Sequence, residues 1–179
     1  MLDTIRQKKY IYIKNFFTKE ELAILQPYCL ERTFSGENLN NHQSPGCPSF
    51  YKDPILNILL EAKREKAMEV AKIPLLKTYA FWRGYIHGGI LEDHKDRPSC
   101  EISITANIDS CGEKWPIHMD NKWITMEVGD AVMYLGCDVL HGRKPFKGKY
   151  CAQVFFHYVD ANGPFRSFEN DARDGYVSG

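Results

Sequence analysis

The sequence predicts a mainly β fold, a jelly roll or β-sandwich, with helices packed on one face of the sheets. Two observations support this prediction. Helical periodicity is confined to roughly the first 75 residues, and glycine-containing turns divide the remainder into short, strand-like segments. Helices first and many short strands afterwards are typical of a sheet fold whose helices are segregated to one face.

The N-terminal part, 1–75, is expected to begin with a strand and a helix. Residues 10–13 have the composition of a short strand. Thr18 followed three residues later by Glu21 is a capping box, which marks the start of a helix. Apolar residues recur with helical spacing from there to about Glu31, so we expect the helix to end near that residue.

A loop and a second helix complete this part of the chain. Residues 35–49 are rich in Gly, Pro, Asn and Ser, and fit equally well a lid over a substrate or a solvated connector. A second helix is expected over 53–72, because apolar residues recur along it. Charges of both signs alternate over 61–66, and such a run is usually a solvated helix face.

The jelly-roll core is expected over 76–160. Its clearest strand spans 101–108, where Ile102, Ile104, Ala106 and Ile108 alternate with other residues and therefore share one face. The polar segment after Asn162 is expected to be irregular. Four further strands are predicted from the same kind of pattern, over 77–86, 123–128, 131–135 and 150–159.

Composition limits the classes of function. A chain of 179 residues fits one domain, here 1–179, and can bury a core without disulfides. Basic and acidic residues number 23 each, so nothing draws the whole chain to nucleic acid or anionic membranes. We find no signal peptide and no apolar run of transmembrane length. Six cysteines without a C-x-x-C pair then indicate free thiols and a cytoplasmic protein.

Three residues form a candidate metal site. His94 and Asp96 are two positions apart, so on a strand both side chains would point to the same side. His141 follows a later apolar strand and would complete a set of two histidines and one carboxylate. Such a set leaves three open positions on an octahedral Fe(II), and zinc accepts the same ligands. An H-x-D pair alone also arises by chance, so the surrounding sequence has to support it.

The surrounding sequence resembles the prolyl-hydroxylase-like 2-oxoglutarate/Fe(II) oxygenases, particularly small bacterial and phage members. In that family a tyrosine often lies about nine residues before the first iron histidine, and Tyr85 has this position within the stretch 85–96. The stretch 128–141 resembles the family's strand that begins with Gly-Asp-Ala and ends at the second histidine. The resemblance covers about residues 76–160 and does not identify a substrate.

The resemblance implies a double-stranded β-helix in which His94, Asp96 and His141 bind Fe(II). It also implies 2-oxoglutarate and O2 as cosubstrates, and we allow for ascorbate as an additional reductant. The expected reaction is hydroxylation of a C–H bond in a small molecule or a protein side chain, with release of succinate and CO2. Halogenating relatives replace the iron carboxylate with a small residue, so the presence of Asp96 implies hydroxylation or a related oxidation.

The distal carboxylate of 2-oxoglutarate needs a cation, because a buried carboxylate without a partner is very costly. The family places Lys or Arg nine or ten residues after the second histidine, where this chain has Tyr150 and Cys151. Lys149, one residue earlier, is our preferred candidate. Arg143 is the alternative, because a guanidinium binds a carboxylate through two hydrogen bonds. An exposed surface cation is the ordinary explanation for either residue.

Two uncharged residues are further candidates for binding 2-oxoglutarate. The hydroxyl of Tyr85 is expected to donate to the same carboxylate, although a tyrosine on a strand can equally belong to the core. Gln153 lies four residues after Lys149, and His157 four residues after that, so all three would face the same side of the last strand. The cosubstrate contacts predicted from the sequence are therefore Lys149, Tyr85, Arg143 and Gln153.

Two other functions use the same residues. A zinc or other metal hydrolase would need a general base, for which Glu92 and Asp93 are close in sequence, although alternation turns Asp93 away from His94. A jelly-roll binding or sensor module would keep the metal without turnover. A nucleic-acid substrate is disfavoured, since no basic patch is interleaved with aromatic residues. Substrate specificity is expected to reside in loops 35–49 and 109–119.

Overall fold

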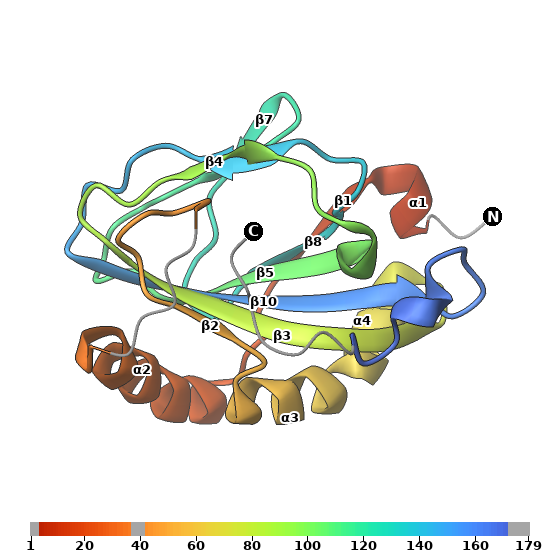
Figure 1. Ribbon diagram of the computed structural model, residues 1–179, viewed down its shortest axis with the longest axis horizontal. Coiled ribbons are helices and arrows are strands. Elements are labelled where there is room, and N and C mark those ends of the chain that lie inside the picture. Colours follow the sequence, from red (N-terminus) through yellow and green to blue (C-terminus); the bar gives the residue numbers. More distant parts are fainter. Residues whose placement is uncertain (1–3, 37–41, 172–179) are drawn as a thin grey trace.

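The computed structural model describes residues 4–36 and 42–171, which fold as two antiparallel sheets that face each other (Figure 1). The larger sheet has the order β1-β8-β5-β10-β3-β2, with strands Tyr10–Ile13, Ala131–Leu135, Ile102–Asp109, Tyr150–Asp160, Leu75–Ile86 and Ser49–Tyr51. The smaller sheet has the order β4-β9-β6-β7, with strands Leu91–His94, His141–Arg143, Ile117–Met119 and Lys122–Ile124. The predicted mainly β jelly roll with N-terminal helices is confirmed.

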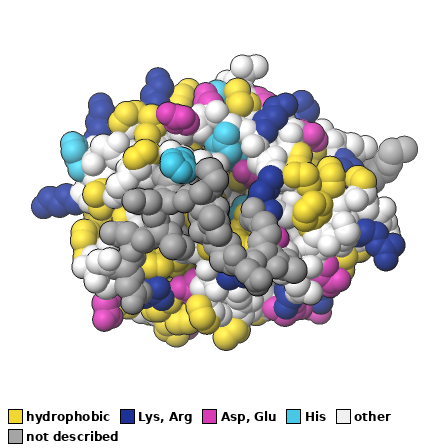
Figure 2. Space-filling view, viewed as in Figure 1, with side chains coloured by type: hydrophobic (Ala, Val, Ile, Leu, Met, Phe, Trp, Pro, Cys, Tyr) yellow, Lys and Arg dark blue, Asp and Glu magenta, His cyan; other side chains and the backbone are white. Residues whose placement is uncertain are grey.

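Three helices, α2 (Lys19–Phe34), α3 (Pro54–Ala62) and α4 (Arg64–Ala71), pack against the larger sheet, whereas α1 (Ile5–Lys8) lies beside β1 and β8 at its edge (Figure 1). Two short 3-10 turns are η1 (Pro98–Cys100) and η2 (Arg166–Phe168). Figure 1 shows α2 and α3 beneath this sheet, on the side away from the smaller sheet. No helix of the described residues is long and apolar enough to span a lipid bilayer. In Figure 2, acidic and basic side chains are interspersed over the face in view, in keeping with the zero net charge.

The capping box predicted at the start of α2 is confirmed. The Thr18 side chain accepts a hydrogen bond from the backbone N–H of Glu21 at 3.2 Å, and the Glu21 carboxylate accepts one from the backbone N–H of Thr18 at 2.8 Å. Two donors at the helix N-terminus that would lack partners are thereby satisfied. The helix ends at Phe34, a little beyond the predicted end near Glu31.

The predicted helix over 53–72 is two helices, α3 and α4, that meet at Lys63. Lys63 lies in the charged run expected to be solvated, yet it is buried. Its ammonium donates to the backbone oxygen of Phe16 at 2.9 Å and to the carboxylate of Glu21 at 2.6 Å. The prediction for this residue is wrong because a long side chain can cross an apolar surface and pair its charge beyond it.

The shortest strands differ most from prediction. The strand expected over 123–128 is reduced to β7, three residues long. The loop expected over 35–49 ends at Ser49, the first residue of β2, and positions 37–41 lie outside the described residues. Strands β4, β6 and β9 have only three or four residues, too few for alternation to reveal them. Two of these three strands, β4 and β9, carry the two candidate metal histidines.

Strand β5 shows how the larger sheet separates two buried environments. Ile102, Ile104, Ala106 and Ile108 belong to the main apolar core, as the alternation predicts. The intervening Ser103, Thr105 and Asn107 are equally buried and point to the other side of the sheet. This second side is the space between the two sheets, and the candidate site lies in it.

Candidate metal centre and cosubstrate pocket

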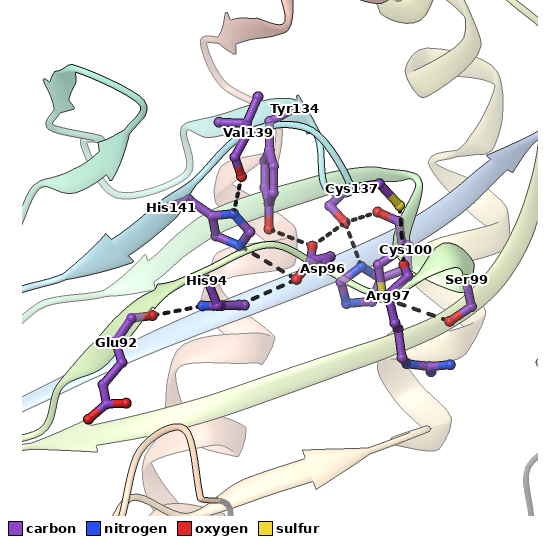
Figure 3. Close-up of polar contacts among 12 residues, drawn as sticks. Glu92, His94, Asp96, Arg97, Ser99, Cys100, Tyr134, Cys137, Val139 and His141 are labelled. Atoms are coloured by element: carbon purple, nitrogen blue, oxygen red, sulfur yellow. Dashed lines mark hydrogen bonds and ion pairs between the residues drawn. The ribbon is translucent and has the colours of Figure 1, made fainter.

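The three predicted metal ligands converge at one end of the smaller sheet (Figure 3). His94 ends β4 and His141 begins β9, and the two residues are direct partners in the antiparallel pairing. Their Nε2 atoms lie 3.4 and 3.5 Å from the same oxygen, Oδ1 of Asp96. Asp96 lies just beyond β4 and is held by a 2.8 Å hydrogen bond from its backbone N–H to the oxygen of Gly136.

Backbone oxygens fix the orientation of both imidazoles. Nδ1 of His94 is 2.8 Å from the oxygen of Glu92, and Nδ1 of His141 is 2.9 Å from the oxygen of Val139. A carbonyl oxygen can only accept, so each Nδ1 carries a proton, and in the neutral imidazole each Nε2 then has its lone pair free. Both lone pairs are therefore available to a metal ion on the side of Asp96.

The carboxylate of Asp96 is positioned through its second oxygen. Oδ2 accepts hydrogen bonds from the hydroxyls of Ser103 at 3.1 Å and Tyr134 at 3.4 Å. Burial alone would raise the pKa of Asp96, but the imidazoles of His141 and His94, which donate to the carboxylate whenever their Nε2 atoms are protonated, outweigh burial and hold the pKa well below its usual range. A Cβ atom on Gly136 would lie 2.6 Å from Oδ2, so glycine is needed for this approach.

The donor set fits a divalent transition metal. The ligand atoms of His94, Asp96 and His141 all lie within 4.8 Å of one another. Two imidazoles and one carboxylate without a thiolate suit Fe(II), and they occupy one side of the ion. A second group of possible ligands, formed by Asp96, Cys100 and His157, is less suitable. Burial raises the pKa of the Cys100 thiol, and Nδ1 of His157 is already paired with Ser103 at 2.8 Å.

A cavity of about 250 Å³ adjoins the triad. Aromatic rings form much of its wall, and three cations reach it, whereas Asp96 is its sole carboxylate among the described residues. Its lining comprises Gln43, Tyr79, Phe81, Arg83, Leu91, His94, Lys95, Asp96, Arg97, Cys100, Tyr134, His141, Phe155 and His157. A metal on the triad would face a pocket with an aromatic wall and with positive charge at several points.

Comparisons with known proteins agree on the fold. No protein-family model matches the chain, and no curated protein matches its sequence. Among solved structures, the non-heme alpha-ketoglutarate-dependent epimerase SnoN of nogalamycin biosynthesis matches with a TM-score of 0.72 and 11% identity, over 88% of this chain and 80% of that one. The chain has the fold of the 2-oxoglutarate/Fe(II) oxygenases.

Two prolyl hydroxylases show the same likeness. A Pseudomonas putida prolyl-4-hydroxylase matches with a TM-score of 0.66 and 15% identity, over 86% of this chain and 94% of that one. The viral collagen prolyl hydroxylase from Paramecium Bursaria Chlorella virus-1 matches with a TM-score of 0.64 and 12% identity, over 87% of this chain and 98% of that one. At these identities the likeness concerns the oxygenase fold, and function has to be argued from the site.

Arg83 is the buried cation of the cavity. It lies on β3, and its side chain donates from Nε to Ser49 at 2.9 Å and from Nη1 to the hydroxyl of Tyr85 at 3.0 Å. Its Nη2 atom is buried and has no hydrogen-bond partner among the described residues. An unpaired buried guanidinium nitrogen is costly, so this atom is suited to an anion that enters the cavity.

Arg143, the alternative cation of the sequence analysis, is buried behind this cavity and does not line it. Its two terminal nitrogens donate to the oxygen of Trp115 at 2.6 Å and to the side chain of Gln153 at 3.1 Å. Gln153 in turn donates to Asn107 at 3.1 Å and is the direct neighbour of Arg83 in the pairing of β10 with β3. Arg143 and Gln153 thus form a hydrogen-bonded network next to Arg83.

The structure does not bring Lys149 to the site. Lys149 precedes β10, is exposed, and is absent from the cavity lining. Tyr85, by contrast, is fully buried, and its ring packs edge-on against Trp115 at 4.6 Å between centroids. The structure therefore brings His94, Asp96 and His141 together at the cavity, whereas neither Tyr85 nor Lys149 belongs to its lining. Of the cations that line it, Arg83 is the buried one.

Sequence reasoning missed several residues that contact the triad. Ser103 and Tyr134 bind the Asp96 carboxylate, and Ser103 also connects Asp96 with His157. Ser103 is one of the polar residues that alternate with the isoleucines of β5. The order of the sheet shows that β5 is a central strand, so these polar residues are buried instead of facing solvent. Nothing comparable marked Tyr134, which lies in an otherwise apolar strand.

Proposed function

We propose that this protein is a 2-oxoglutarate- and Fe(II)-dependent dioxygenase that oxidises a C–H bond. One observation carries the proposal: His94 and His141 direct their Nε2 atoms toward one oxygen of Asp96, beside a cavity that contains the partly unpaired Arg83. His94, His141 and Asp96 would hold the iron. When bound, Fe(II) and 2-oxoglutarate supply O2 activation, with release of succinate and CO2.

Arg83 is our candidate for the distal carboxylate of 2-oxoglutarate. It lines the same cavity as the triad and has a free Nη2 donor, while its Nη1 donates to Tyr85. Thr105, on the facing side of β5, has a buried hydroxyl without a partner in the described part of the chain and could donate as well. Arg143 and Gln153 would support Arg83 from behind.

The cavity lining favours an oxygenase over a metal hydrolase. A hydrolase of this kind needs a general base next to the metal-bound water. Glu92 is exposed, and it contacts the triad only through its backbone oxygen. Asp93 lies 3.4 Å from Nδ1 of His118, away from the cavity. Neither carboxylate is available for this role.

The names of the structural neighbours indicate which substrates are reasonable. Two of the matched proteins are prolyl hydroxylases, and SnoN belongs to nogalamycin biosynthesis. We therefore propose a small molecule or a peptide side chain as the primary substrate of this chain.

The test is succinate formation from 2-oxoglutarate by protein loaded anaerobically with Fe(II) and then exposed to O2. His94→Ala, Asp96→Ala and His141→Ala should each abolish Fe(II) binding and succinate formation, because each removes one of three ligands. His87→Ala is the control, since His87 is exposed and lies outside the cavity lining.

Each result separates the three functions. Fe(II)-dependent succinate that is lost in the triad variants supports the oxygenase. Zinc binding with hydrolysis and no succinate would establish the hydrolase instead, and metal binding without any turnover would establish a binding module. Wild-type succinate formation in all three triad variants would show that the metal site has been misassigned.

A further inference from the structure

A second arginine of the cavity lining, Arg97, lies next to the metal ligands in the sequence. It directly follows Asp96, lines the cavity, and places its guanidinium carbon 4.9 Å from the ring centroid of Tyr79. Figure 3 shows its side chain extending away from the triad, beyond Cys100. The cavity thus meets one arginine from β3 and another from the loop after β4.

The guanidinium of Arg97 holds a carboxylate that belongs to the chain itself. Asp171, beyond η2, forms an ion pair with Nη2 of Arg97, and its side chain is buried. The backbone oxygen of Asp171 accepts a hydrogen bond from Nζ of Lys52, which also donates to the oxygen of Asn170 at 3.2 Å. The guanidinium of Arg97 is therefore paired with a buried carboxylate of this chain and at the same time lies over the ring of Tyr79.

The wall next to Arg97 is a mainly aromatic cluster separate from the main core. The cluster consists of Tyr79, Phe81, Cys100 and Phe155, with Tyr51 packed against it. All but Tyr51 line the cavity. The rings of Tyr51 and Tyr79 are 4.7 Å apart, and those of Phe81 and Phe155 are 5.8 Å apart. Such a wall fits a flat apolar group of limited size.

We propose that the primary substrate is a small carboxylate with an aromatic or similarly flat apolar body, and that Arg97 binds its carboxylate in the position that Asp171 occupies here. The inference rests on the proposed function, because the oxidised carbon must lie beside the triad. Arg83 and Arg97 then divide the two anions, 2-oxoglutarate and substrate, between separate sites.

Exchange of one carboxylate for another suits this position energetically. Removing Asp171 without replacement would leave Arg97 unpaired beside apolar rings, which is costly. An incoming carboxylate restores the same charge-assisted hydrogen bonds, which are the strong ones between guanidinium and carboxylate. Asp171 lies after the last strand and outside both sheets, so its release breaks no strand pairing.

The probes for the test are phenylacetate and its neutral isostere phenylacetamide. Their binding is measured by calorimetry on protein loaded anaerobically with Fe(II) and saturating 2-oxoglutarate, so that Arg83 is already occupied. Asp171→Asn should bind phenylacetate about tenfold more tightly than the wild type, since the competing charge is gone, with no gain for phenylacetamide. Glu169→Gln, the same charge change at an exposed position two residues earlier, should behave as the wild type.

Arg97→Gln should abolish the preference for phenylacetate over phenylacetamide, whereas Arg97→Lys should retain part of it. The matched control is Arg166→Gln, an exposed arginine on the same C-terminal segment as Asp171. Equal affinities of the wild type and Asp171→Asn for phenylacetate would overturn the proposal, and so would undetectable binding of both probes to both proteins. Succinate formation is measured separately, so its absence with intact phenylacetate binding would refute only the oxygenase.

Discussion

The two faces of the larger sheet are both buried, but one carries apolar side chains and the other carries many polar ones. Toward the helices, β5 and β10 present apolar side chains such as Ile104 and Phe156, which belong to the main core. Toward the smaller sheet, the same strands present Thr105, Gln153 and His157, which are also buried. One face therefore contributes stability through apolar burial, whereas the other buries polar groups that burial alone does not favour.

The difference teaches where to look for a site in a fold of this kind. Buried polar atoms normally have hydrogen-bond partners. Between the sheets, Nη2 of Arg83, Oγ1 of Thr105 and Nε of Arg143 have none within the described parts of the chain. A ligand with carboxylate oxygens would supply acceptors for such donors. Burying these unpaired donors lowers the stability of the ligand-free protein, and hydrogen bonds to the ligand would offset that loss on binding.

Phe155 and Phe156 are adjacent and point to opposite faces, so truncating each one tests the comparison most strongly. Phe156 is fully buried and packs edge-on against Phe17 at 5.8 Å between centroids. Phe156→Ala should lower the free energy of unfolding by about 3–5 kcal/mol, because it leaves an enclosed void in the core. The measurement is urea denaturation followed by circular dichroism.

Phe155→Ala should cost clearly less stability in the same measurement. The ring of Phe155 already borders the cavity, so its removal enlarges an existing space instead of creating a new one. Equal losses for the two variants would mean that both faces act as ordinary core, contrary to the comparison.

Arg83→Gln should produce the next largest effect, and on binding rather than folding. Loss of the charged donor should weaken 2-oxoglutarate binding by about 1.5–3 kcal/mol, or roughly ten- to a hundredfold. The dissociation constant is measured by anaerobic titration of the Fe(II)-loaded protein with 2-oxoglutarate. Lys149→Gln removes an exposed cation outside the cavity and should leave this constant unchanged. A larger loss of 2-oxoglutarate affinity in Lys149→Gln than in Arg83→Gln would show that Lys149 binds the distal carboxylate.

The sequence predicted the long strands because they depend on a local pattern, and its three candidate metal ligands lie together in the structure. Alternation over β5 is strong enough to assign Ile104 to the core. The short spacing from His94 to Asp96 survives in the structure although Asp96 lies beyond the strand, since its backbone bond to Gly136 brings its carboxylate to both histidines. The pairing of β4 with β9 then sets His94 opposite His141.

The buried cation of the cavity, Arg83, could not be predicted in the same way because its position depends on contacts between distant segments. The spacing from His141 along the chain favours Lys149 as the partner of the distal carboxylate. Arg83 reaches the cavity only because β3 pairs with β2 and β10, which places Ser49 and Gln153 beside it. The ion pair of Arg97 with Asp171 joins residues 74 positions apart, so no local sequence pattern predicts it.

The smallest predicted effect is at Thr105. Its hydroxyl should lower the stability of the ligand-free protein and raise the affinity for 2-oxoglutarate, so one substitution tests both. Thr105→Val keeps the shape of the side chain and removes a buried hydroxyl whose oxygen has no partner in the described structure. The ligand-free protein should therefore be equally stable or up to about 1 kcal/mol more stable, because an unsatisfied polar group is replaced by a methyl group. Thermal unfolding without 2-oxoglutarate measures this change.

With 2-oxoglutarate present the sign should reverse, because a valine cannot donate to the bound carboxylate and affinity should fall by up to about 1 kcal/mol. Thr78→Val is the contrasting variant, since the Thr78 hydroxyl already donates to the oxygen of Ser99 at 2.8 Å. That variant should destabilise the ligand-free protein and leave 2-oxoglutarate affinity unchanged. If Thr105→Val instead destabilised the ligand-free protein as Thr78→Val does, the hydroxyl would serve folding, and the face between the sheets would have no donor reserved there for a ligand.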